Sequence, residues 1–147
     1  MIISNSVLYL QLSPNTDPPD LPSSPAMRAV VIIDADVAPD WQRFVSQWLV
    51  RSGCLYMLAW GPGCSSWDDS VDFASIERHG FQAIPDDESV MTTWHENDPL
   101  EDVFHFAKSC ASHPTVPLDR TVLLHISTTP REHEMLARYA SVLPDGE

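Results

Sequence analysis

Apolar, β-branched runs that alternate with helical periodicity after Arg28 constrain the fold of this chain more than any other feature. Strand-like runs occupy residues 29–33, 54–60 and 121–126. Such continuous apolar composition is typical of strands covered on both faces. Segments with apolar side chains at helical spacing begin near residues 39, 65, 99 and 130. Because parallel strands need crossover helices, we expect an α/β fold of three layers, with a mainly parallel sheet of four or five strands and helices on both faces, Rossmann-like or flavodoxin-like.

The segment between the second and third expected helices is harder to interpret. Residues 81–84 and 90–94 are each short strand candidates, and an acidic loop separates them. Polar side chains that can cap a helix precede the later helix starts. These cap candidates are Ser65 or Ser66, Asp98 and Thr129.

The first 26 residues differ in composition from the rest, and we interpret them as a proline-rich N-terminal extension before a single α/β domain at residues 27–147. Five of the 13 prolines lie in residues 14–25, which predicts an extended linker. Residues 7–12 alternate in a way that suits a short edge strand, which could join this sheet or support dimerisation with a second copy. Because Met27 immediately precedes the first strong strand, a further hypothesis is that residues 1–26 are dispensable.

The charge balance excludes some partners. The chain has 21 acidic and 8 basic residues and a formal net charge of -13, so we expect neither nucleic acid nor an anionic membrane surface as a partner. No stretch approaches the roughly 18 apolar residues that span a bilayer, and the start lacks a basic region typical of secretory signals. These features predict a cytoplasmic protein. The three cysteines have no CxxC spacing, which disfavours a structural zinc site.

Two carboxylates follow the first strong strand. Asp34 and Asp36 leave it two residues apart and could share a divalent cation such as Mg²⁺. Residues 31–37 resemble the first motif of haloacid-dehalogenase-like phosphatases, but Ala38 stands where that family has a small hydroxyl residue. That family and the receiver domains of two-component signalling also need a lysine near the phosphate, and the one lysine here, Lys108, lies inside an expected helix.

Two alternative functions remain open from these residues. One is a small metal-dependent hydrolase or phosphotransfer enzyme that uses Asp34 and Asp36, with His95 and Glu96 as helpers; outside this alternative we expect no cofactor. The other is a degenerate nucleotide-sensing fold that uses the loop at residues 61–66, which precedes a helix but lacks both GxGxxG spacing and a P-loop lysine. His125 lies within an apolar run, so we interpret it as a core histidine.

Acidic residues concentrate in the middle of the chain. Residues 68–102 contain eleven acids and one base, Arg78. One explanation of this concentration of acids is that they form a solvated face that keeps the protein soluble. The other, which leads our functional hypotheses, is a non-catalytic acidic protein-interaction domain (an adaptor, inhibitor or immunity-like protein) that docks a basic protein partner. The partner-binding candidates are Trp67, Asp68, Asp69, Asp86, Asp87, Glu88 and Trp94.

Several segments together resemble a family of short bacterial proteins of unknown function. They are residues 60–61, 66–72, 92–104 and 106–108. The resemblance covers most of the chain after Arg28 and implies a bacterial, cytoplasmic, single-domain protein. It implies no activity and assigns no site residue.

Overall fold

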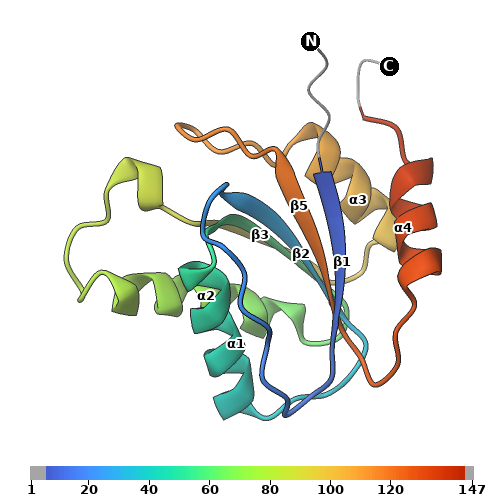
Figure 1. Cartoon of the computed structure of the whole chain (residues 1–147), viewed down its shortest axis with the longest axis horizontal. Coiled ribbons are helices and arrows are strands. Elements are labelled where there is room, and N and C mark those ends of the chain that lie inside the picture. The colour runs from blue at the N-terminus through green and yellow to red at the C-terminus, as the bar shows by residue number, and fades with distance from the viewer. Residues whose placement is uncertain (1–5, 145–147) are drawn as a thin grey trace.

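The structure is a computed structural model that describes residues 6–144. Five parallel strands form one sheet in the order β1-β5-β2-β3-β4 (Figure 1). The strands are β1 (Ser6–Leu12), β2 (Met27–Ile33), β3 (Cys54–Trp60), β4 (Met91–His95) and β5 (Arg120–Ile126). The helices are α1 (Pro39–Arg51), α2 (Cys64–Arg78), α3 (Leu100–Ser109) and α4 (Glu132–Ser141), with a short 3-10 helix, η1 (Asp86–Glu88). The predicted three-layer α/β fold is confirmed.

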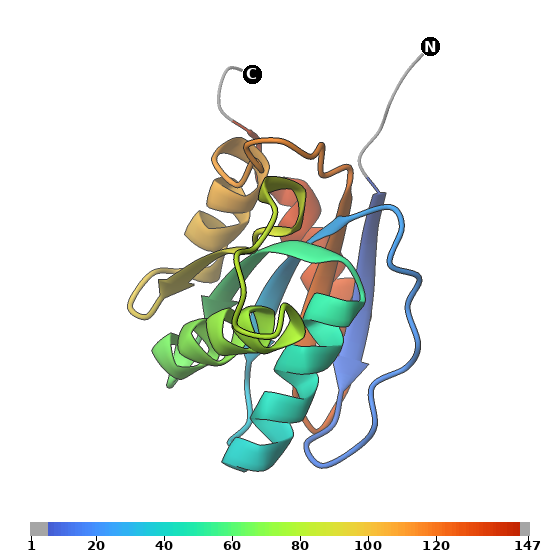
Figure 2. The same ribbon diagram turned by 90° about the vertical axis from the view of Figure 1, so that its left-hand side faces the viewer.

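The helices cover the sheet as two separate layers. Figure 2 shows α1 and α2 in front of the sheet and α3 and α4 behind it. Every residue of β2 is buried, and alternate side chains enter opposite cores. Val31 and Ile33 pack with α1 and α2, whereas Val30 and Ile32 pack with α3 and α4. The continuous apolar run in β2 therefore reflects burial on both faces.

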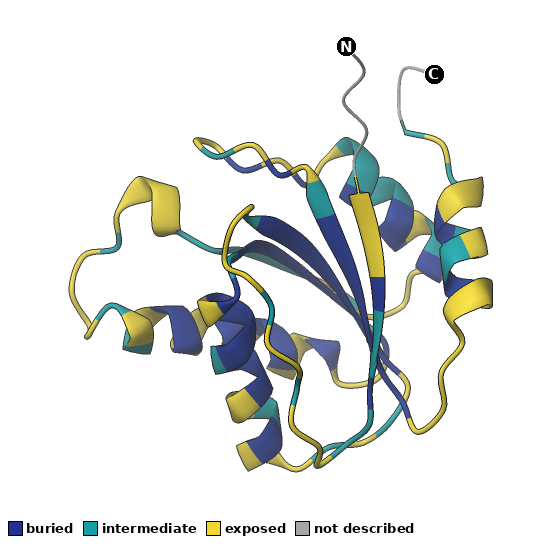
Figure 3. Cartoon of the chain, in the orientation of Figure 1, coloured by how far each residue is buried: buried dark blue, intermediate teal, exposed yellow. Residues whose placement is uncertain are grey.

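β1 joins the chain's own sheet. It pairs with β5 in parallel, with Leu8 opposite Val122. It occupies one end of the sheet, and its first residues are exposed (Figure 3). Within residues 6–144, β5 is the only strand that pairs with β1, so the outer edge of β1 is unpaired there. Dimerisation through that edge stays a prediction.

The proline-rich segment that follows β1 lies against α1. The indole N–H of Trp41 donates to the carbonyl of Thr16 at 2.8 Å, and that of Trp48 donates to the carbonyl of Pro19 at 2.8 Å. Gly53 approaches the same segment closely. It has φ of +89°, and a Cβ there would lie 2.3 Å from the Ser23 carbonyl oxygen. A residue without a side chain is therefore required at this crossing.

Some local expectations were wrong. Residues 81–84 do not form a strand, because Gly80 and Phe81 both adopt left-handed conformations that end α2 in a turn. The N–H of Phe81 donates to the carbonyl of Ile76 in that turn. Pairing with β3 is taken instead by β4, which matches the candidate at 90–94.

The predicted side-chain caps were also wrong. α2 begins at Cys64 after a left-handed Gly63, so Ser65 and Ser66 lie inside the helix, and the Ser66 hydroxyl donates to the Gly63 carbonyl. None of α2, α3 and α4 has a side-chain cap hydrogen bond. Asp98 and Thr129 both lie before the residues that flank their helices. The carboxylate of Asp98 turns toward His95 instead.

The three thiols differ in burial, which gives a direct test of the packing. Cys54 and Cys64 are buried and Cys110 is exposed. Burial raises the pKa of the Cys54 thiol to about 12, and a protonated, enclosed thiol is a poor nucleophile. In the native protein at pH 8, we expect an aromatic disulfide reagent to label one thiol per chain, and three after denaturation. Rapid labelling of two or more thiols in the native state would contradict this packing.

Candidate functional site

The carboxyl end of the sheet contains the position where open α/β folds usually bind ligands. The chain runs outward from β2 through β3 to β4, and then returns to β5 on the other side of β2. Ligands of such folds bind where the strand order reverses, outside the carboxyl ends of the strands. Here that position lies between β2 and β5, and Asp34 directly follows β2.

A chain of hydrogen bonds crosses this position. Asp34 Oδ2 lies 2.6 Å from His125 Nε2, and His125 Nδ1 lies 2.7 Å from the Tyr9 hydroxyl. The Tyr9 oxygen also accepts the Arg131 backbone N–H at 2.9 Å. The Tyr9 hydroxyl hydrogen is therefore available to Nδ1, and Nε2 faces the Asp34 carboxylate. Burial raises the pKa of Tyr9, and the Arg131 N–H partly offsets that effect.

These three residues come from three adjacent strands or strand ends, and the sequence showed only part of the arrangement. The interpretation of His125 as a core residue was correct as regards burial, since its side chain is fully enclosed. Its partnership with Asp34 was missed. The side chain of Asp34 is 37% exposed, so the chain of hydrogen bonds reaches the surface at that carboxylate.

Two open hollows lie beside Asp34. One, of about 290 Å³, is lined by Asp34, Asp36 and Pro62 together with Ile33 and Ala35. The other, of about 270 Å³, extends along Gln42, Gly63 and Ser66. Asp34 and Asp36 thus line the same hollow, as their spacing suggested.

His95 and Glu96 do not join this pair. They lie at the end of β4, and β3 separates β4 from β2, which places the strand ends roughly 10 Å apart. The His95 ring is already engaged, with Nε2 2.9 Å from the Thr93 hydroxyl and its centroid 5.1 Å from that of Phe106. Within residues 6–144, no group of three His, Cys, Asp or Glu side chains is placed to hold a metal ion.

The loop at residues 61–66 packs against the end of β2. Gly61 has φ of +114°, and a Cβ there would lie 2.5 Å from the Ile33 carbonyl oxygen. Burial raises the pKa of the Cys64 thiol at the start of α2, and the nearby carboxylate of Glu96 adds to this effect. The loop therefore packs tightly against the end of β2.

Two of the partner-binding candidates are enclosed. Trp67 is 2% exposed and packs in the core between the sheet and the layer of α1 and α2, so it cannot contact a partner as expected. Asp68 is buried beside it, and its Oδ1 has no hydrogen-bond partner among the described residues. Both lie on the inner side of α2, because helical periodicity directs residues 67, 71 and 74 toward the sheet.

The remaining candidates lie around the outer side of α2 and the edge strand β4. The Thr92 hydroxyl donates to Asp72 Oδ1 at 2.9 Å, which places Thr92 on the α2 side of β4. Side chains alternate along a strand, so Trp94 points to the same side, about 7 Å further along. Asp69 lies about one helical turn before Asp72 in the same direction, because α2 runs antiparallel to the strands. Trp94 is 53% exposed.

Exposed apolar side chains continue this surface toward the end of α2. Phe73 and Ile76 are exposed on the helix, and Phe81 contacts Phe73 edge-on, with 6.1 Å between ring centroids. The Arg43 guanidinium lies 5.8 Å from the centre of the Phe73 ring. We name this set the α2–β4 surface. Its members are Asp69, Asp72, Phe73, Ile76, Phe81 and Trp94.

The short helix η1 carries further carboxylates to the rim of the α2–β4 surface. Asp86, Asp87 and Glu88 are all exposed. His79 directly follows α2, and its Nε2 lies 3.3 Å from Glu88 Oε1. This contact joins η1 to the carboxyl end of α2. Five of the seven predicted partner-binding residues therefore lie on this surface or at its rim.

The carboxylate of Asp72 provides a pH-dependent test of the contact between α2 and β4. Burial raises its pKa, Asp68 and Asp69 raise it further, and the Thr92 hydrogen bond opposes them. The folded protein then binds this proton more tightly than the unfolded chain. The contribution stabilises the fold below the ordinary Asp pKa of about 4 and is lost as the pH rises through the raised pKa.

We expect Asp72→Asn, which keeps an oxygen for Thr92, to raise the melting temperature at pH 7 and to leave stability unchanged near pH 3. Thermal unfolding at both pH values measures this. Asp17→Asn removes the same charge at an exposed position outside α2 and β4 and is the control. A lower stability of Asp72→Asn at pH 7 would count against a carboxylate destabilised by burial.

The fold defines this chain as a parallel α/β protein with an acidic edge. It belongs to the family described as "Domain of unknown function (DUF7684)", whose model matches residues 7–142. The matched region includes β1 and the proline-rich segment as well as the four helices. The resemblance to a family of unknown function is thereby confirmed. No curated protein and no solved structure matches the chain. No helix among the described residues is long and apolar enough to cross a membrane.

Proposed function

We propose that this protein is a non-catalytic interaction domain that docks a basic protein partner on the α2–β4 surface. The observation that carries the proposal is that exposed apolar side chains and carboxylates lie together there. Trp94 is exposed on the β4 side of α2, on the same face of β4 as the Thr92 that bonds Asp72, and Phe73 is exposed on the side of α2 toward Arg43 of α1. Aromatic anchors surrounded by polar groups are typical of interface centres.

The charges on this surface favour a cationic partner. Asp69 and Asp72 are exposed on α2, and Asp86 and Asp87 lie at the rim. With a net charge of -13, the whole chain also attracts basic proteins at long range. The apolar side chains would provide affinity, whereas the carboxylates would speed association and select against acidic partners.

The position of the surface at the end of the sheet supports the same function. β4 is the last strand of the sheet, and only β3 pairs with it among the described residues. An extended segment of a partner could approach this edge without displacing any strand. A role as an adaptor, inhibitor or immunity-like protein would use such a surface.

The test is capture of partners from the native host by the immobilised full-length protein and by charge-reversed variants. The test variant is Asp69→Lys with Asp72→Lys. The matched control is Asp17→Lys with Asp20→Lys, which makes the same change in net charge at exposed positions of the segment that packs on α1.

We expect a basic protein that both the natural chain and the control retain, and that the test variant loses. Its retention should also weaken with added salt. Partners that survive reversal at Asp69 and Asp72, or that both variants lose equally, would reject the α2–β4 surface as the docking site.

A further inference from the structure

The outer edge of β1 lacks the features that normally protect an edge strand. β1 ends the sheet beyond β5, and no other strand among residues 6–144 pairs with it. It contains no charged residue and no proline, and it pairs with β5 in unbroken register along its whole length. Edge strands of natural proteins usually carry charges, prolines or bulges that prevent pairing with another chain. The outer edge of β1 therefore offers a regular row of backbone groups to a further strand.

Apolar side chains are exposed on both faces of this strand. Val7 is 39% exposed and Leu8 is 42% exposed. Tyr9 packs in the core with α3 and α4, whereas Leu10 packs against the core with α1 and α2. Because side chains alternate along a strand, Val7 lies on the α4 side of β1 and Leu8 on the α1 side. A helix laid on one face would cover one of these two side chains, whereas a strand added at the edge contacts both.

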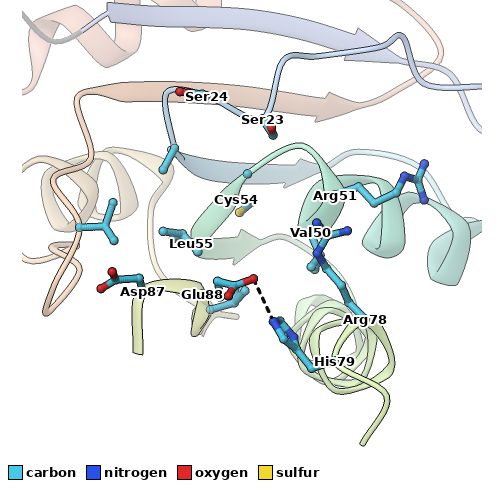
Figure 4. A pocket seen from close by; sticks show the side chains of 14 residues that line it. Ser23, Ser24, Val50, Arg51, Cys54, Leu55, Arg78, His79, Asp87 and Glu88 are labelled. Atoms are coloured by element: carbon cyan, nitrogen blue, oxygen red, sulfur yellow. Dashed lines mark hydrogen bonds and ion pairs between the residues drawn. The ribbon is translucent and has the colours of Figure 1, made fainter. Parts of the chain in front are cut away.

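The proline-rich segment is held on the α1 side of β1. Two indole N–H groups of α1 donate to its carbonyls, and the Arg120 guanidinium donates to the Pro22 carbonyl at 3.0 Å. Ser23 and Ser24 then lie at a cavity of about 350 Å³ at the amino end of the sheet, which the ends of α1 and α2 and the helix η1 also line (Figure 4). Figure 1 shows the result, with β1 at the front of the sheet between this segment and α4.

The distribution of charge favours a second copy of this chain as the occupant of the edge. Eleven of the 21 acidic residues lie in residues 68–102, the segment that includes most of α2 and all of β4. β4 is at the opposite end of the sheet, four strand spacings or roughly 19 Å from β1. Two copies that meet at β1 therefore keep their most acidic segments far apart. A basic partner would find no carboxylate on β1 itself.

We propose that β1 pairs with the β1 of a second copy and joins the two sheets edge to edge. Both copies use the same edge, so a two-fold axis relates them and the two β1 strands run antiparallel. The backbone groups of the two edges then satisfy one another, and Val7 and Leu8 of each copy pack beside the facing strand. The two α2–β4 surfaces lie at the outer ends of the joined sheet, so this dimer neither requires nor blocks partner docking.

Sedimentation equilibrium of the purified full-length protein tests this pairing. We expect a reversible monomer–dimer equilibrium at micromolar concentrations. Added salt should strengthen the dimer, because it screens the repulsion between two acidic chains, whereas it should weaken the docking of a basic partner. Leu8→Lys should weaken dimerisation about tenfold or more, since the two-fold axis places the new charge in the interface twice. Val7→Lys makes the corresponding change on the other face of β1 and should cause a similar loss.

Two matched variants should dimerise as the natural chain does. Leu8→Val keeps an uncharged apolar side chain on the edge, and Gln82→Lys adds the same charge at an exposed turn after α2. Far-UV circular dichroism should show that both edge-lysine variants stay folded as monomers. A natural chain that is monomeric at every protein and salt concentration would overturn the proposal. A dimer that Leu8→Lys and Val7→Lys both retain, or that Gln82→Lys loses equally, would overturn β1 as the interface. Because purified protein alone is used, failure here is distinguishable from failure of the docking surface.

Discussion

Replacing Trp67 with alanine is expected to lower the free energy of unfolding by about 3–5 kcal/mol. The side chain is among the largest that are fully buried, and it packs between α2 and the sheet with Val71 and Ala59. Truncation removes its apolar contacts and leaves a cavity that a closely packed core cannot fill. A loss of this size is a large share of the roughly 5–15 kcal/mol that holds a typical domain folded.

Trp94→Ala is the matched variant, because it makes the same chemical change on the same acidic segment of the chain. Trp94 is half exposed, so its loss should change stability by only about 0.5 kcal/mol. Although Trp94→Ala should have little effect on stability, it should weaken the capture of partners. Denaturant unfolding followed by far-UV circular dichroism avoids dependence on tryptophan fluorescence. Equal losses of stability in the two variants would contradict the assignment of one tryptophan to the core and the other to the surface.

Removal of residues 1–26 is expected to cost at least about 3 kcal/mol, because Tyr9 and Leu12 are buried and each contributes about 1.5–3 kcal/mol through apolar burial. The deletion also removes the hydroxyl that bonds His125 and the carbonyls that accept the indole N–H groups of Trp41 and Trp48. Buried donors left without acceptors add to the loss.

A chain that begins at Ser6 retains β1 and is the control for that deletion. The chain that begins at Met27 should unfold at a much lower denaturant concentration than this control or fail to fold. Coincident unfolding of the Met27 chain and the full chain would support the hypothesis that the first 26 residues are dispensable and would contradict this prediction.

Local sequence patterns predicted most of the fold correctly. The runs at 29–33 and 121–126 became buried central strands, because their composition suits burial on both faces. Residues 81–84 were misassigned for the converse reason. A short apolar run does not show whether the backbone before it turns, and the left-handed pair at Gly80 and Phe81 decides that here.

The sequence likewise predicted one part of the candidate site and missed another. The placement of Asp34 at the end of a strand, where it lines a hollow with Asp36, followed from the alternation of strands and helices. Its bond to His125 joins residues 91 positions apart, and the next bond to Tyr9 spans 116 positions. No spacing rule predicts such pairs, because they depend on β1 and β2 lying on either side of β5.

The sequence by itself determined the parallel α/β architecture and the acidity of the middle of the chain, since both follow from composition and local periodicity. Only the tertiary structure decided which acidic and aromatic residues face a partner, because the inner and outer sides of α2 are set by its packing on the sheet. It also decided that the ends of α1 and α2 and the helix η1 line one cavity.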